Sequence, residues 1–315
     1  MPIALEHIRR MRGGAQAHLL RCSDGGYYVV KFQNNPQHPR VLVNELLGTR
    51  LAARMGLPTP PAGVIEVRKE LIENTAELVV QTGTGRIPCA PGFQFGSRFP
   101  GDPATQPVHD FLPDELLGQV ANLSDFAGML VFDKWTCNTN GRQAIFTQGR
   151  GERGEGRGKL ETRNSKLETP HSSLATRHSA ASGPDSRLPT PDSRSSRSPG
   201  YSAWMIDQGF CFNAGEWNFP DAPLRGIYAR NRVYESVRGM ETFQPWLERV
   251  EKAISESVLD SLAAEIPPEW YGCDTGALGR LFEQLLRRRR RLPDLLREAK
   301  DTYRRPFVNW GGNHA

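Results

Sequence analysis

The alternation of apolar and polar residues in the N-terminal third of the chain predicts a small sheet and one helix. Two β-prone runs, residues 19–22 and 27–32, flank an Asp-Gly-Gly turn, which is typical of a hairpin. Residues 41–55 carry leucines at helical spacing and end before Gly56, so a helix is expected there. Further strands are expected at residues 64–67 and 77–81, and a long Gly- and Pro-rich connection at residues 82–107.

From about Asp114 onward the pattern becomes mostly helical. Helices are predicted at residues 114–120, 124–132, 230–237, 244–264, 274–291 and 293–303, and a strand begins at Tyr201. The sequence therefore predicts an α+β fold, with a β-rich first part followed by a mostly helical second part.

Residues 148–200 interrupt this pattern because they contain almost no large apolar side chains. Such a segment cannot bury enough surface to offset its ordering entropy, so we expect a disordered insertion. Two interpretations stay open: a tolerated insertion at a surface turn, or a Ser/Thr-rich target of phosphorylation.

Charge and cysteine content indicate which binding partners and which cellular compartment to expect. The formal net charge is +5, and residues 148–200 hold ten basic against six acidic side chains, so the rest of the chain is close to neutral. The run Arg287–Arg291 is interpreted as the polar face of a helix, with an acidic or RNA partner as the alternative. Five scattered cysteines with no paired spacing, and an N-terminus without a long apolar run, lead us to expect a cytoplasmic protein without a membrane span.

The strongest chemical signal is a set of oxygen-bearing side chains on either side of the insertion. Asp133 and Asn138 follow an apolar run, and Asp207 ends a second apolar run just before Gln208 and a glycine. A carboxylate can accept a hydroxyl proton, while amide and carboxylate oxygens ligate Mg²⁺. Asp133 and Asp207 lie 74 positions apart, but 21 once residues 148–200 are left out. The alternative is that these side chains only form turns and caps.

Upstream residues supply groups that could hold a nucleotide. Gly13 and Gly14 precede a strand, where backbone N–H groups can approach phosphates, although an ordinary turn fits the same residues. Lys31 is the one charge in an apolar strand, and Glu45 lies on the predicted helix that follows. Read separately, Lys31 could face solvent on an edge strand and Glu45 could be a solvated helix residue.

Taken together, the order Lys31, Glu45, Asp133–x4–Asn138 and Asp207-Gln208-Gly209 resembles the HipA-like kinase family over roughly residues 8–147 and 201–300. The resemblance implies a bilobal, protein-kinase-like fold, ATP and Mg²⁺ as ligands, and phosphoryl transfer to a hydroxyl, expected to be protein Ser or Thr. It implies that Lys31 contacts the phosphates, that Glu45 orients Lys31, and that Gly13 and Gly14 approach the nucleotide.

In the same comparison Asp133 is the catalytic base, and Asn138 and Asp207 are metal ligands. The implied domains are an N-terminal nucleotide-binding lobe and hinge (1–107), a helical catalytic lobe (108–147 and 201–305) and the insertion (148–200).

Two departures from typical protein kinases restrict the resemblance. Val131 and Phe132 stand where such kinases have His-Arg, so activation by an Arg-paired phosphate is not expected. Gln208 replaces the usual Phe after the metal-binding Asp, so a Phe-based switch is not expected either. No DNA-binding motif is found, and no DNA partner is predicted.

Three other functions stay open at this point. The first is a nucleotide-binding pseudokinase without turnover, and the second is a lipid or small-molecule kinase. The third is an RNA- or membrane-surface-binding protein that uses the arginine run. The sequence does not identify the acceptor.

Overall fold

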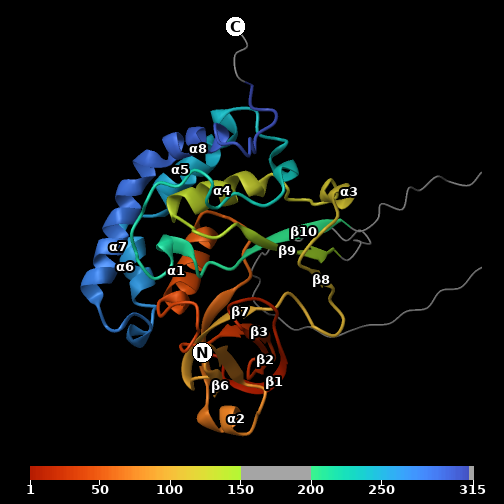
Figure 1. The fold of residues 1–315 in the computed structure, drawn as a ribbon, viewed down its shortest axis with the longest axis vertical. Coiled ribbons are helices and arrows are strands. Elements are labelled where there is room, and N and C mark those ends of the chain that lie inside the picture. Colours follow the sequence, from red (N-terminus) through yellow and green to blue (C-terminus); the bar gives the residue numbers. More distant parts are fainter. Residues whose placement is uncertain (150–199, 312–315) are drawn as a thin grey trace, which may run out of the picture. The chain divides into compact units, whose positions relative to one another are not determined.

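Five antiparallel strands form the main sheet of the N-terminal part. The computed structural model describes residues 1–149 and 200–311 and is shown in Figure 1. The strands run in the order β1 (Ala4–Arg10), β2 (His18–Cys22), β3 (Tyr27–Lys31), β7 (Gly92–Arg98) and β4 (Ala62–Val67). Because β3 pairs with both β2 and β7, Lys31 lies on an interior strand and not on an edge.

Helix α1 (Val41–Arg54) packs against this sheet at β4 and β7. Its buried side belongs to a large core that also includes Phe95 of β7 and the C-terminal helices. A second core, built on Leu20, Val30 and Ile65, lies among the strands and is joined by Ile72 of helix α2 (Lys69–Glu73) and by the hairpin of β5 (Val79–Thr82) and β6 (Gly85–Pro88).

A second, three-stranded sheet carries the segment that leads to Asp207. Strand β9 (Gln143–Gln148) pairs with β10 (Tyr201–Ile206) and with the short β8 (Val108–His109). Helices α3 (Asp114–Leu117) and α4 (Asp125–Trp135) precede it. Asp207 directly follows β10, as the sequence predicts.

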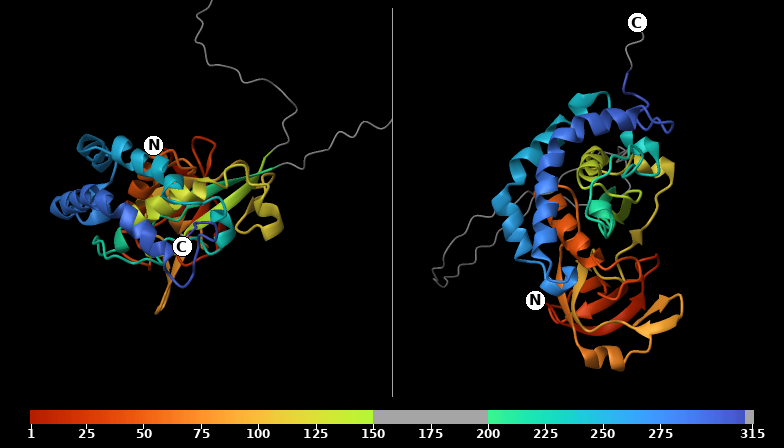
Figure 2. Two further views of the ribbon diagram at one scale, coloured as in Figure 1. Left: turned by 90° about the horizontal axis from the view of Figure 1, so that it is seen from above. Right: turned by 60° about the vertical axis from the view of Figure 1, so that its left-hand side comes forward.

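The C-terminal helices lie side by side next to α1 and α4, as both views of Figure 2 show. They are α5 (Gln244–Ala253), α6 (Glu256–Ala263), α7 (Thr275–Arg288) and α8 (Leu292–Lys300), with 3-10 turns at Cys211–Asn213, Asn231–Tyr234, Met240–Thr242, Pro268–Tyr271 and Arg289–Arg291. Their amphipathic sequences bury one face in the large core.

The α+β class, with its β-rich first part and mostly helical second part, is confirmed. Three predicted elements are wrong. The helix expected at residues 230–237 is only a 3-10 turn at Asn231–Tyr234. The expected connection at residues 82–107 contains β6 and β7, and the expected helix at 244–264 is two helices separated at Ile254 and Ser255. Strand β7 was hidden because Gly92 and Gly96 lower its apparent strand propensity, although the Cβ of a larger residue at Gly96 would collide with Ile65.

The predicted disordered insertion lies almost entirely outside the described residues. The described residues 1–148 and 200–311 belong to one unit, and the boundary expected between residues 107 and 108 stays a prediction. Among the helices of the described chain, none combines the length and the apolar character that crossing a bilayer requires.

Candidate active site

Lys31, Glu45 and Asp207 come together in the structure. The ammonium of Lys31 donates to Oε1 of Glu45 and, over 2.8 Å, to Oδ1 of Asp207. The side chain of Lys31 is 9% exposed, that of Glu45 is 3% exposed and that of Asp207 is 16% exposed. Strand β3, helix α1 and the loop after β10, which is 176 positions from Lys31, therefore deliver one cation and two carboxylates to one place.

Electrostatics in this group favour a charged lysine beside an ionised Asp207. Burial disfavours the charge on Lys31, but Glu45 and Asp207 outweigh it, so the pKa of Lys31 is raised above its ordinary value. Burial likewise opposes ionisation of Asp207, yet Lys31 holds the pKa of Asp207 below its ordinary value. Burial, together with the nearby Asp207 carboxylate, raises the pKa of Glu45.

Glu45 also holds the backbone that follows Asp207. Its Oε2 accepts from the N–H of Gln208 over 3.1 Å, and its Oε1 accepts from the N–H of Gly209 over 2.8 Å. Gly48, one turn further along α1, lets the helix approach, because a Cβ built there would lie 2.7 Å from Cβ of Gln208. Helix α1 therefore positions both Lys31 and Asp207.

The Gly13–Gly14 turn lies between β1 and β2, on the chain segment that precedes Lys31. Gly13 has a φ of 110°, a region that favours glycine. The turn is tied down at its neighbour Ala15, whose carbonyl accepts from Nδ2 of Asn35 over 2.8 Å. A contact between this turn and phosphates stays a prediction.

The structure does not place Asp133 where the sequence led us to expect it. Asp133 lies within helix α4, not in a loop, and it is 1% exposed. Its carboxylate accepts from both Nε (2.8 Å) and Nη2 of Arg142, whose side chain is 0% exposed. A base must be reached by the hydroxyl that it deprotonates. In this conformation Asp133 is the partner of a buried arginine and faces no solvent, and its role as the base stays a prediction.

Asn138 belongs to the same buried group, and its role as a metal ligand stays a prediction. Its Nδ2 donates to Asp133 over 2.9 Å, and its Oδ1 accepts from the N–H of Asn140 over 3.1 Å. The residue is 1% exposed. Of the two predicted metal ligands, only Asp207 lies beside Lys31.

Arg142 connects the two groups. Its Nη1 donates to the carbonyl of Ile206 over 2.8 Å and to Oε1 of Gln208 over 2.9 Å, while the rest of its guanidinium holds Asp133. Arg142 thus links helix α4 to the residues on either side of Asp207 through buried hydrogen bonds. Sequence reasoning missed it, although a carboxylate in an apolar run signals that a counter-charge must exist.

The donor set near Lys31 fits a metal that is held mainly by a nucleotide. Within residues 1–149 and 200–311, no cluster of three or more His, Cys, Asp or Glu side chains is arranged to hold a metal by itself. Mg²⁺ is commonly bound by one or two carboxylates together with phosphate oxygens and water. Asp207, partly exposed and next to the cation of Lys31, fits that kind of site.

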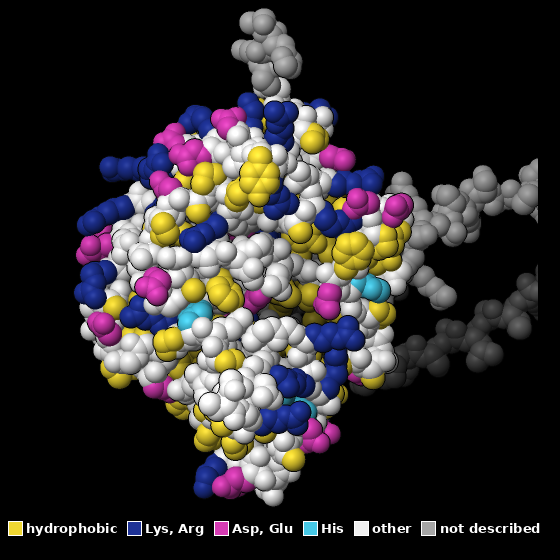
Figure 3. Space-filling model, in the orientation of Figure 1, with side chains coloured by type: hydrophobic (Ala, Val, Ile, Leu, Met, Phe, Trp, Pro, Cys, Tyr) yellow, Lys and Arg dark blue, Asp and Glu magenta, His cyan; other side chains and the backbone are white. Residues whose placement is uncertain are grey.

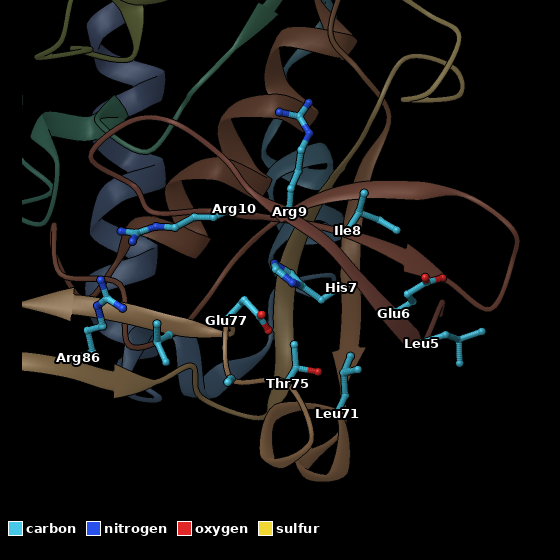
Figure 4. Close-up of a pocket in the computed structure, with 12 residues that line it drawn as sticks. Leu5, Glu6, His7, Ile8, Arg9, Arg10, Leu71, Thr75, Glu77 and Arg86 are labelled. Carbon is cyan, nitrogen blue, oxygen red and sulfur yellow. The ribbon is translucent and has the colours of Figure 1, made fainter.

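One cavity lies away from this group. It has a volume of about 850 Å³ and is lined by β1 and the segment from α2 to β6, including His7, Arg9, Arg10, Glu77 and Arg86 (Figure 4). None of the predicted site residues lines it. The chemistry implied by Lys31 and Asp207 therefore has no connection with this cavity.

The arginine run is mostly engaged within the fold. Arg288 donates to the carbonyls of Lys134 and Phe219, and Arg289 donates to the carbonyl of Ile254. Arg287 pairs with Glu283, and Arg291 pairs with Asp221. Acidic and basic side chains also alternate along that edge of the molecule in Figure 3. These contacts favour the interpretation as a helix face over that as a nucleic-acid patch.

Comparison with known families adds an independent observation. Residues 5–146 match the family described as HipA-like kinase. The resemblance to HipA-like kinases is confirmed. The match covers Gly13, Gly14, Lys31, Glu45, Asp133 and Asn138, but it ends before Asp207.

Solved structures give weaker similarities. The Golgi casein kinase with Mn/ADP bound has a TM-score of 0.43 and 12% identity, with 99% of this chain and 78% of that chain covered. A second structure of the Golgi casein kinase has a TM-score of 0.44 and 13% identity, with 97% of this chain and 75% of that chain covered. The hydra Fam20 structure with sugar has a TM-score of 0.44 and 10% identity, with 95% of this chain and 86% of that chain covered. Among curated proteins, none matches the chain.

Proposed function

We propose that the protein is an ATP-dependent phosphotransferase that transfers the γ-phosphate of Mg-ATP to a hydroxyl. The observation that carries this proposal is the buried Lys31, held between Glu45 of α1 and Asp207 after β10. A kinase requires such a lysine–glutamate pair, together with a metal-binding aspartate. The match of residues 5–146 to HipA-like kinases supports the same conclusion.

Each of the three residues has a role that follows from its position. Lys31 binds phosphate oxygens, and Glu45 keeps Lys31 extended and fixes the backbone of Gln208 and Gly209. Asp207 would ligate Mg²⁺, and a metal bound there would neutralise the charge that develops on the transferred phosphate. Gly13 and Gly14 bring backbone N–H groups to the nucleotide.

Asp133 is not assigned as the base in this proposal, because Arg142 and Asn138 occupy its carboxylate. Phosphoryl transfer depends mostly on positioning and on electrostatic stabilisation, so it does not require a strong base. The acceptor is proposed to be a protein Ser or Thr, by analogy with the family. A lipid or small-molecule hydroxyl is the alternative.

Labelled ATP tests this proposal directly. The wild-type protein, incubated with γ-labelled ATP, Mg²⁺ and a cell extract, is expected to transfer label to an acceptor or to itself. Asp207→Asn, which keeps the shape but loses the charge, is expected to lower the rate by about 100-fold or more, since metal-mediated charge stabilisation is lost. Equal rates in the two proteins would contradict the role of Asp207.

The burial of Asp133 favours a second candidate function, a nucleotide-binding regulator without turnover. In that case Mg-ATP raises the melting temperature of the protein, but no label is transferred and no ADP is released. The same two assays therefore separate the two candidates.

A further inference from the structure

Helix α1 carries a second side chain that holds the residues after Asp207. Nδ2 of Asn44 donates to the carbonyls of Gly209 (2.9 Å), Cys211 (2.9 Å) and Ala214 (2.8 Å). Asn44 is 0% exposed. An amide nitrogen has two hydrogens, so at least one of them is shared between two of the three carbonyls. We call these three hydrogen bonds the Asn44 clasp.

The orientation of the Asn44 amide follows from its other partner. Nε1 of Trp217 donates to Oδ1 of Asn44 over 2.9 Å. An indole nitrogen can only donate, so the atom that faces it must be the amide oxygen. The nitrogen is therefore the atom that faces the three carbonyls.

The clasp holds a backbone that is unfavourable by itself. Five residues of the Asp207 loop (residues 207–217) have positive φ without being glycine: Asp207 (61°), Phe212 (59°), Asn213 (57°), Ala214 (57°) and Trp217 (53°). Such conformations cost free energy and persist where surrounding contacts determine them. The clasp supplies three of these contacts at a buried position.

Neighbours of Asn44 reinforce the same attachment. Nε2 of His38 hydrogen-bonds the carbonyl of Gly209 at 2.8 Å. Nη1 of Arg40 donates to the carbonyl of Gly215 over 2.9 Å, and its guanidinium lies 4.2 Å from the ring centroid of Trp217. The start of α1 and the Asp207 loop are therefore joined along most of the loop.

The loop contains no side chain that a kinase could modify. Residues 208–226 include no Ser, Thr or Tyr. Phosphorylation within this segment therefore cannot order it, in contrast to kinases whose activation segment is ordered by a phosphate.

We propose that Asn44 is the positioning residue that sets the Asp207 loop, so that the nucleotide site is assembled without phosphorylation. The consequence of this proposal, that Asp207 is placed to ligate Mg²⁺, rests on the proposed function. The clasp itself can be tested without any enzymatic activity.

Asn44→Asp is the informative variant, because it keeps the shape of the side chain but presents carboxylate oxygen to three carbonyl oxygens. We expect backbone amides of residues 208–217 to exchange hydrogen about tenfold faster or more in the nucleotide-free variant. Exchange elsewhere in the chain should be unchanged. The matched control is Asn309→Asp, because Asn309 is exposed and its Nδ2 donates to only one carbonyl, that of Glu235, over 2.8 Å.

Trp217→Phe provides a milder test if Asn44→Asp does not fold. It removes the indole donor that orients the amide but keeps an aromatic ring, and it should raise exchange within the same ten residues to a smaller extent. Unchanged exchange in this segment in either folded variant overturns the proposal, as does faster exchange in the wild-type protein after phosphatase treatment.

Nucleotide affinity distinguishes positioning from general structural support. With Asp207 misplaced, Asn44→Asp should weaken binding of Mg-ATP about tenfold, while binding of ATP without metal changes little. An equal loss with and without Mg²⁺ contradicts positioning. If the wild-type protein fails to bind Mg-ATP at all, the proposed function is wrong, whereas the exchange result still decides on the clasp.

Discussion

At the scale of single residues, two buried ion pairs have different consequences. Lys31 contacts two carboxylates, of which Asp207 remains partly exposed. Asp133 and Arg142 are both fully enclosed, at 0% side-chain exposure. The first arrangement leaves a carboxylate for a ligand, whereas the second leaves none.

Removing Asp133 should therefore destabilise the protein instead of only stopping catalysis. Asp133→Ala leaves the guanidinium of Arg142 buried without its counter-charge, and such changes cost about 3–5 kcal/mol in the free energy of unfolding. Urea unfolding of the variant and of Glu265→Ala, which removes the half-exposed partner of Arg50, measures the difference. The control should lose about 1 kcal/mol or less. An Asp133→Ala protein as stable as the wild type, yet inactive, would restore the base role.

At the scale of elements, close packing of α1 against the Asp207 loop depends on a glycine. Gly48 lies in the interior of α1, where alanine is normally preferred by about 1 kcal/mol. Alanine would place its Cβ 2.7 Å from Cβ of Gln208. Glycine at position 48 therefore lowers the helix propensity of α1 but allows α1 to lie close to the Asp207 loop.

Gly48→Ala should weaken Mg-ATP binding even though alanine favours the helix. Overpacking at such a contact costs about 1–3 kcal/mol, and here it pushes Gln208 and Asp207 away from Lys31. The comparison is Gly279→Ala in α7, where nothing lies within 4 Å of the new Cβ. That variant should stabilise the protein by up to about 1 kcal/mol with unchanged affinity. If calorimetric titration gave the same affinity for Mg-ATP in Gly48→Ala and Gly279→Ala, the packing argument would be contradicted.

The contact between β1, β2 and the β5–β6 hairpin should make stability dependent on pH. His18 is 0% exposed, and burial, aided by His7, lowers its pKa from 6.5 to about 4. Between these values the unfolded chain binds more protons than the folded chain, so the free energy of unfolding falls as pH drops from 6.5 towards 4.

Urea unfolding of the wild type and of His18→Gln at pH 7 and pH 4.5 isolates this contribution, because carboxylates elsewhere affect both proteins alike. The variant should lose less stability between the two pH values. An equal loss would mean that His18 is not the group responsible.

At the scale of the whole molecule, local patterns predicted most elements but not their partners. The spacing of leucines predicted α1, and the Asp-Gly turn predicted the β2–β3 hairpin. The order of Lys31, Glu45 and Asp207 also predicted the group that the structure assembles. Arg142 and Asn44 could not be found in this way, because each contacts residues distant in sequence, up to 173 positions away.

The two ends of the segment that separates β9 from β10 are held together by the sheet. Gln148 pairs directly with Tyr201. Replacing residues 150–199 by a Gly/Ser loop of about five residues, a common hairpin length, should leave the melting temperature and the affinity for Mg-ATP unchanged. Loss of nucleotide binding in this variant would show that the replaced segment contributes to the site.

The most direct test of the central claim is a calorimetric titration with ATP, with and without Mg²⁺, of the wild type and of Asp207→Asn. If Lys31 and Asp207 hold a metal-bound nucleotide, the wild type binds Mg-ATP at least about tenfold more tightly than metal-free ATP. Asp207→Asn should lose that difference. No binding by the wild type, or a metal dependence that survives in Asp207→Asn, would contradict the account.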